Sequence, residues 1–141
     1  MRKLLLTLAL AILGPVAAHA QASFECNIIS AASTNSTNCT ALPAVRYRGV
    51  VLYNTTTTVG FLRLYNATAA PTCSSATGFI KSIPVVPASA AGQVGQTVVV
   101  LQLPVIYQLG LGFCLTGGSS STDNTNSVVG IFGTIMYSVG R

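Results

Sequence analysis

One stretch of the sequence decides the fold class: residues 96–116, which read QTVVVLQLPVIYQLGLGFCLT. Its first part, 96–103, is rich in β-branched and apolar side chains, which favour a strand. The apolar run 98–113 could be taken for a membrane span, but Pro104 and Gly110 interrupt it. A spanning helix needs about 20 consecutive apolar residues, so a strand, a turn and a second strand are the better interpretation.

Other β-rich runs flank this stretch on both sides. We expect strands at 45–53, 60–65, 79–86, 96–103, 112–116 and 128–139. The first two are interpreted as a hairpin around a longer loop, and Pro84 within the third marks an edge strand. The last strand carries apolar residues on both faces, which predicts a central position in a sheet.

No segment has the apolar period of an amphipathic helix. Several short strands punctuated by glycine and proline are typical of two packed sheets. The sequence therefore predicts an all-β fold, a single antiparallel β-sandwich with a jelly-roll-like arrangement over residues 45–141. Residues 21–44 are mainly small and polar, and we expect them to form an irregular N-terminal arm tied by a disulfide.

Residues 1–20 have the pattern of a secretory signal peptide. Arg2 and Lys3 precede an apolar run at 4–13, and residues 18–20 (AHA) form a small-x-small cleavage site. We therefore expect export to the periplasm, the cell surface or the extracellular space. The apolar run is too short to span a bilayer comfortably, so no membrane span is expected in the mature chain.

Four cysteines follow the signal segment: Cys26, Cys39, Cys73 and Cys114. An even number in an exported chain indicates two disulfides, for which three pairings are possible. We expect Cys26–Cys39, which would tether the polar arm, and Cys73–Cys114, which would tie a loop to the middle of a later strand. A metal site is disfavoured because the spacing contains no CxxC pair and no histidine follows the signal segment.

Beyond the signal segment the chain has almost none of the side chains that catalysis uses. It contains no histidine there, its only acids are Glu25 and Asp123, and its only lysine is Lys81. Without Arg2 and Lys3 the seven cations fall to five, and the two acids leave a formal net charge of +3. These counts predict a protein that is not an enzyme and has no cofactor, and they give no strong nucleic-acid-binding signal.

The candidate binding residues are Arg46, Arg48, Arg63 and Tyr65. Side chains alternate along a strand, so Arg46 and Arg48 share one face. In one register of the expected hairpin Arg63 and Tyr65 join that face, and the strip would contact acidic groups of a glycan or nucleic acid. The alternative is a solvated sheet face, and three cations fall far short of a nucleic-acid footprint.

A second candidate motif is 123–126, which reads DNTN. It resembles part of a calcium loop but lacks the second carboxylate and the closing glutamate. Because Asp and Asn side chains also bond their own backbone in turns, we favour a turn within a polar loop at 117–126.

Short motifs in the second half of the chain are similar to a known group of proteins. The motifs are 64–72 (LYNATAAPT), 83–88 (IPVVPA), 110–118 (GLGFCLTGG) with 123–125 (DNT), and 133–137 (GTIMY). They resemble small β-sandwich proteins encoded among bacteriophage and prophage structural genes. The resemblance implies a surface, decoration or attachment role without catalysis. The signal segment and Cys73 and Cys114 depart from that pattern, so an exported bacterial relative fits better than a virion part.

Two functions remain open on the sequence alone. Charged residues make up 6 % of the chain, against about 25 % in an average soluble domain, and so little charge does little to prevent self-association. This favours an exported, non-enzymatic structural or surface-interaction protein, with a homo-oligomer or a surface polymer as its partner. The alternative is a monomeric secreted binding module or inhibitor that recognises an acidic glycan or protein through the arginine and tyrosine face.

Overall fold

The computed structural model describes residues 22–30, 36–127 and 129–140, so the expected signal peptide lies outside the described residues. Those residues form eight strands and no helix: β1 (Ser23–Ile29), β2 (Ser36–Thr40), β3 (Val45–Asn54), β4 (Gly60–Asn66), β5 (Phe79–Val85), β6 (Gly95–Tyr107), β7 (Leu111–Thr116) and β8 (Ile131–Val139). Within the same ranges, no helix has the length and apolar character needed to cross a bilayer.

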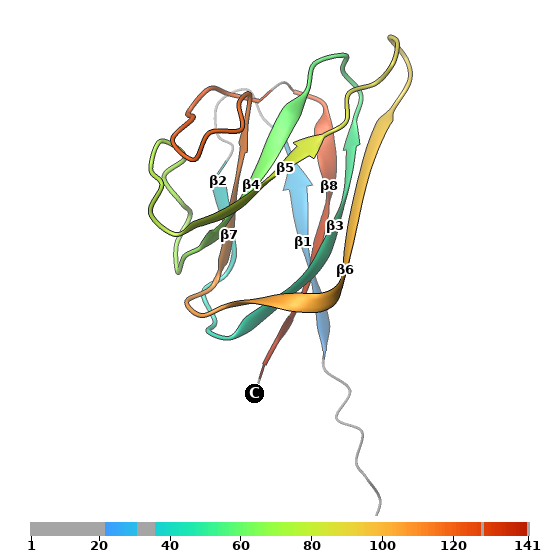
Figure 1. Cartoon of the computed structure of the whole chain (residues 1–141). Coiled ribbons are helices and arrows are strands. Elements are labelled where there is room, and N and C mark those ends of the chain that lie inside the picture. Colours follow the sequence, from blue (N-terminus) through green and yellow to red (C-terminus); the bar gives the residue numbers. More distant parts are fainter. Residues whose placement is uncertain (1–21, 31–35, 128, 141) are drawn as a thin grey trace, which may run out of the picture.

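The strands form two four-stranded antiparallel sheets (Figure 1). Sheet A has the order β1-β8-β3-β6, and sheet B has the order β2-β7-β4-β5. The pairs are nested, because β1 pairs with β8, β2 with β7, β3 with β6 and β4 with β5. The chain is thus a long hairpin rolled into two layers, which is the arrangement of an eight-stranded jelly roll. The predicted all-β, jelly-roll-like sandwich is confirmed.

The core lies between the sheets, because alternate residues of each strand point inward. The largest fully buried apolar side chains come from both layers: Tyr47, Leu52, Tyr107, Ile28, Ile131 and Ile135 from sheet A, and Leu62, Leu64, Leu111 and Leu115 from sheet B. This single layer of interdigitated side chains is the main apolar contribution to stability.

Most of the expected strands are present within a few residues of their predicted bounds. β5 lies at the edge of sheet B and contains Pro84, and β8 lies between β1 and β3, so both positional predictions are confirmed. Pro104 does not end β6 as expected. The strand continues to Tyr107 because its pairing with β3 shifts register between Tyr47 and Gly49, which accommodates a residue without an N–H.

The expectation of an irregular arm over 21–44 is wrong for two of its segments. β1 and β2 occupy Ser23–Ile29 and Ser36–Thr40 and pair with β8 and β7. Their polar composition hid them, because the partners that complete them lie about a hundred residues and more than seventy residues along the chain. Only Cys26 and Ile28 of β1 are buried, so local sequence carries little of the signal.

The expected hairpin of 45–53 with 60–65 is also wrong, because β3 belongs to sheet A and β4 to sheet B. The loop between them crosses from one layer to the other. Buried Asn54 holds this crossing: its Nδ2 donates to the carbonyl of Thr58 at 2.9 Å, and its Oδ1 accepts from the amide of Thr56 at 2.9 Å. Pairing with strands that are distant in sequence decides which sheet β3 and β4 each join. The sequence of the two segments alone does not show that pairing.

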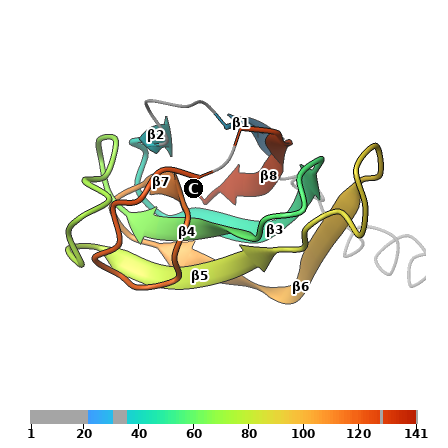
Figure 2. The ribbon, with the colours of Figure 1, turned by 90° about the horizontal axis from the view of Figure 1, so that it is seen from above.

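Both disulfides have the predicted pairing, Cys26–Cys39 and Cys73–Cys114. The first joins β1 to β2 and so ties the edge of sheet A to the edge of sheet B. Figure 2 shows β1 and β2 at one margin of the sandwich and β5 and β6 at the opposite margin. The arm is therefore disulfide-tied, but as two paired strands.

Two tyrosines meet inside the core. The rings of Tyr47 and Tyr107 are edge to face, with centroids 6.3 Å apart. Burial raises the pKa of Tyr47 to about 12 and raises that of Tyr107 as well. Among the described residues the buried Tyr47 hydroxyl has no hydrogen-bond partner, and an unpaired polar group in a core reduces stability.

Replacing Tyr47 by phenylalanine should therefore raise the free energy of unfolding by about 1 kcal/mol, because the ring is kept and the unpaired hydroxyl is removed. Urea denaturation of both proteins measures the difference. Tyr53→Phe is the control, since the Tyr53 hydroxyl lies on the outer face beside Gln96 Nε2, and its effect should stay within about 0.5 kcal/mol. A clear loss of stability in Tyr47→Phe would contradict the account of the core.

Candidate functional site

The structure does not bring the four candidate binding residues together. Arg46 and Arg48 lie on the outer face of sheet A, and Arg48 Nε donates to Ser138 Oγ at 3.2 Å. Arg63 and Tyr65 lie in sheet B and are completely buried. The predicted strip of arginine and tyrosine is therefore not formed, because it depended on the hairpin that the two sheets replace.

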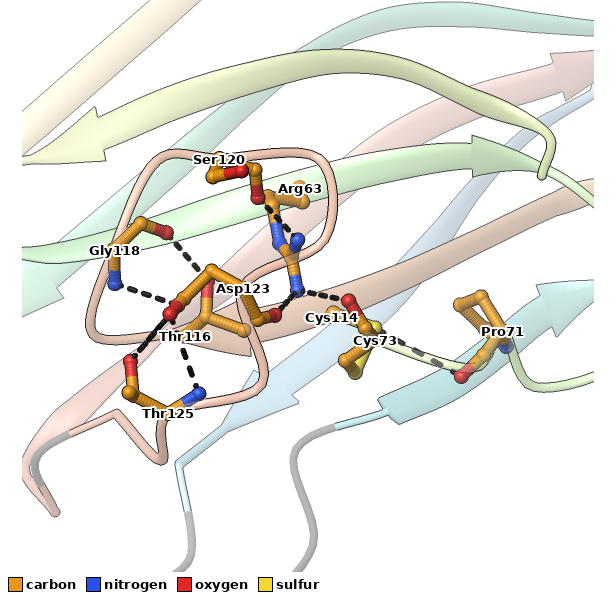
Figure 3. Close-up of a disulfide and its surroundings, with 9 residues drawn as sticks. All are labelled: Arg63, Pro71, Cys73, Cys114, Thr116, Gly118, Ser120, Asp123 and Thr125. Atoms are coloured by element: carbon orange, nitrogen blue, oxygen red, sulfur yellow. Dashed lines mark hydrogen bonds between the residues drawn. A yellow bond between two sulfur atoms is a disulfide. The ribbon is translucent and has the colours of Figure 1, made fainter. Parts of the chain in front are cut away.

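Arg63 instead holds the outer cover of sheet B. Leu62 and Leu64 point into the core, so Arg63 projects from the opposite face of β4. Its guanidinium donates to three backbone carbonyls, those of Cys73, Ser120 and Asp123 (Figure 3). The bond to the Cys73 carbonyl is 2.8 Å long. The planar fork thus joins two loops that are far apart in sequence, one after β4 and one after β7.

The second loop carries one of the two acidic side chains of the sequence. Asp123 accepts from the Gly118 amide at 2.8 Å and from the Thr125 hydroxyl. Desolvation acts to raise the pKa of Asp123, but these hydrogen bonds and the nearby Arg63 charge outweigh it and leave the pKa below its usual value. The segment 123–126 is therefore the backbone-bonded turn that the sequence favoured, and its carboxylate partly balances the buried arginine.

The Cys73–Cys114 disulfide reinforces the same cover. Cys114 lies in β7 directly opposite Arg63, and Cys73 lies in the loop whose carbonyl Arg63 binds. A covalent bond and a charged hydrogen-bonding fork therefore hold this loop at neighbouring positions. We assign Arg63, Asp123 and this disulfide to a structural cluster, called the loop clamp below. It stabilises the fold. Because the Arg63 guanidinium already binds three carbonyls, it is not free to bind a ligand.

Sequence reasoning missed the loop clamp for a physical reason. Arg63 alternates with leucines as a solvent-facing arginine would, and nothing in the neighbouring sequence shows that loops cover it. One signal was available: Cys114 also points outward from its strand, so a disulfide there requires a covering loop on that face.

Among the described residues no loop covers the outer face of sheet A, and this face carries several exposed apolar side chains. Three cross-strand rows define what we call the bare face: Ile29, Phe132, Tyr53 and Gln96; Asn27, Thr134, Val51 and Val98; Glu25, Met136, Gly49 and Val100. Ile29 is 77 % exposed, Val100 is 70 % exposed and Val98 is 53 % exposed. The Tyr53 and Phe132 rings stack with centroids 5.3 Å apart. Exposed apolar side chains that gather on one face often mark an interaction surface.

Within the described ranges no group of three or more histidine, cysteine, aspartate or glutamate side chains could hold a metal ion. Comparisons with protein-family models, with curated proteins and with solved structures found no match. The exposed apolar side chains of the bare face make it the candidate interaction surface of the described residues.

Replacing Arg63 by methionine should lower the free energy of unfolding by about 3 kcal/mol, because each of its three bonds to carbonyls contributes about 1.5–3 kcal/mol and removing a desolvated charge offsets part of that loss. Methionine keeps much of the side-chain length. Arg48→Met is the control, because Arg48 is exposed, and it should cost less than about 0.5 kcal/mol. Equal effects in urea denaturation would show that the loop clamp is not structural.

Removing the second disulfide by Cys73→Ala/Cys114→Ala should cost about 4 kcal/mol, since its sequence separation is 41 residues. The increase in backbone motion should be confined to the loop that the disulfide holds in place. Amide hydrogen exchange in the loop 117–126 should quicken more than exchange in β3. Uniform acceleration across both segments would mean that the disulfide does not act on the loop clamp.

Proposed function

We propose that this protein is an exported, non-enzymatic structural protein that acts by self-assembly through sheet A. The observation that carries the proposal is the bare face, whose exposed valine, isoleucine and aromatic side chains lie in register across four strands. Burying such a surface against another protein removes apolar area from water, which favours association.

The charge of the chain supports association between identical copies. The bare face carries Glu25 at one end and Arg46 and Arg48 near it, and its three rows otherwise contain no charge. Like-charged surfaces repel one another, whereas two copies of this face would not. The small net charge of the mature chain acts in the same direction.

Two disulfides support export, because they form and persist in oxidising compartments outside the cytoplasm. The signal-peptide pattern of residues 1–20 points the same way. The likeness of the 64–137 motifs to phage-type surface proteins and the jelly-roll fold, which also occurs in capsid and lectin domains, support a surface role by analogy.

The scarcity of catalytic side chains supports a non-enzymatic role. The mature chain has no histidine, and its acids lie in β1 and in the loop after β7. The Asp123 carboxylate already accepts hydrogen bonds from Gly118 and Thr125. No pair of general acid and base is available from this set.

The purified, oxidised protein should therefore show a mass of two or more chains by light scattering after size exclusion, and that mass should rise with concentration. Adding salt should strengthen the association or leave it unchanged, because apolar burial drives it. A single-chain mass at every concentration would contradict self-assembly. Salt-sensitive binding of an acidic glycan, lost in Arg46→Ser/Arg48→Ser, would favour the binding-module alternative.

A further inference from the structure

The jelly roll has four edge strands, and three of them are protected against pairing with another chain. β1 and β2 are tied to each other through Cys26–Cys39. β5 contains Pro84, which has no N–H to offer. The Thr97 hydroxyl of β6 also accepts from the amide of Val86 at 2.8 Å and lies 3.2 Å from the carbonyl of Pro84, to which it donates.

β6 contains Pro104 and shares the Thr97 contact with β5, but its segment 96–102 carries neither a proline nor a disulfide. It is the longest strand, with 13 residues, and it borders sheet A with β3 on one side only (Figure 1). No charged residue lies between Lys81 and Asp123, so the edge lacks the lysines that natural edge strands use against pairing. The inward-facing Val99 and Leu101 are themselves only partly buried, as expected where a sheet stops.

The sequence of this edge is nearly a palindrome. Residues 96–102 read QTVVVLQ, centred on Val99. Burial alternates along the segment, so Gln96, Val98, Val100 and Gln102 all face outward. In an antiparallel pair of two such strands centred on Val99, each outward glutamine would face a glutamine and Val98 would face Val100 of the other copy.

We propose that two copies of this chain pair antiparallel through β6 across a two-fold axis at Val99. The proposal rests on the self-assembly proposed above and adds to it a contact along the edge of sheet A, which leaves the bare faces exposed. A two-fold pairing is self-complementary, since each copy presents the same strand to the other. It joins two sheets A into one eight-stranded sheet, satisfies the free backbone groups of both edges and makes the two bare faces continuous.

The test uses charges placed at the outward positions of the edge. In Val98→Lys/Val100→Lys each new lysine would face a lysine of the other copy, and self-association should weaken at least about 10-fold. In Val98→Lys/Val100→Glu each lysine would face a glutamate, and association should return toward that of the native protein. Only the register centred on Val99 produces this reversal.

The matched control is Val94→Lys/Leu109→Lys, which adds the same two charges at exposed apolar positions flanking the strand. It should leave the mass by light scattering unchanged. Thermal unfolding of each variant confirms folding, and recovery of the dimer in the lysine–glutamate variant shows that substitution at these positions leaves the fold intact.

The outcomes separate the two proposals. If the native protein is a single chain at all concentrations, self-assembly fails and the β6 interface fails with it. If the native protein associates but both β6 variants associate equally well, self-assembly stands and the β6 interface is overturned. Weakening by Ile29→Lys/Phe132→Lys alone would then place the contact on the bare face.

Discussion

The pairing of β3 with two strands distant in sequence, β6 and β8, is the interaction on which the rest of the structure depends. β3 pairs with a strand on both sides, with an interruption at Arg48 in both ladders, because a strand buried in a sheet must satisfy its backbone groups. β8 then presents its other edge to β1, which brings the two ends of the described chain together. Such long-range ladders leave little signal in local sequence.

The two outer faces of the sandwich are finished differently, and this asymmetry carries the functional argument. Two loops cover sheet B, held by Arg63 and by the Cys73–Cys114 disulfide. The outer face of sheet A carries exposed valine, isoleucine and phenylalanine side chains. Soluble proteins usually expose charged side chains and bury apolar ones. Sheet B instead buries a cation, which has hydrogen-bond partners within the chain. Sheet A instead exposes apolar side chains, which only a contact with another molecule would remove from water.

Sequence reasoning identified the features that are encoded locally. The runs at 45–53, 60–65 and 79–86 are strands within a few residues, and both cysteine pairs are as expected. It did not identify the strands that contain Cys26 and Cys39, whose polar residues form strands by pairing with β8 and β7. Nor did it separate Arg46 and Arg48 from Arg63, since that division depends on which sheet each strand joins.

The sequence by itself determined the β class, the low charge and the scarcity of catalytic groups, because each follows from residue type or count; of three possible cysteine pairings it favoured the one that the structure has. Only the tertiary structure decided that β3 and β4 occupy different layers, that Arg63 is a buried clamp and that Val98 and Val100 stand on an open edge. The physical reason is that alternation along a strand shows which residues share a face, but not what covers that face. Which face meets the core, a covering loop or water is settled by partners brought from elsewhere in the chain.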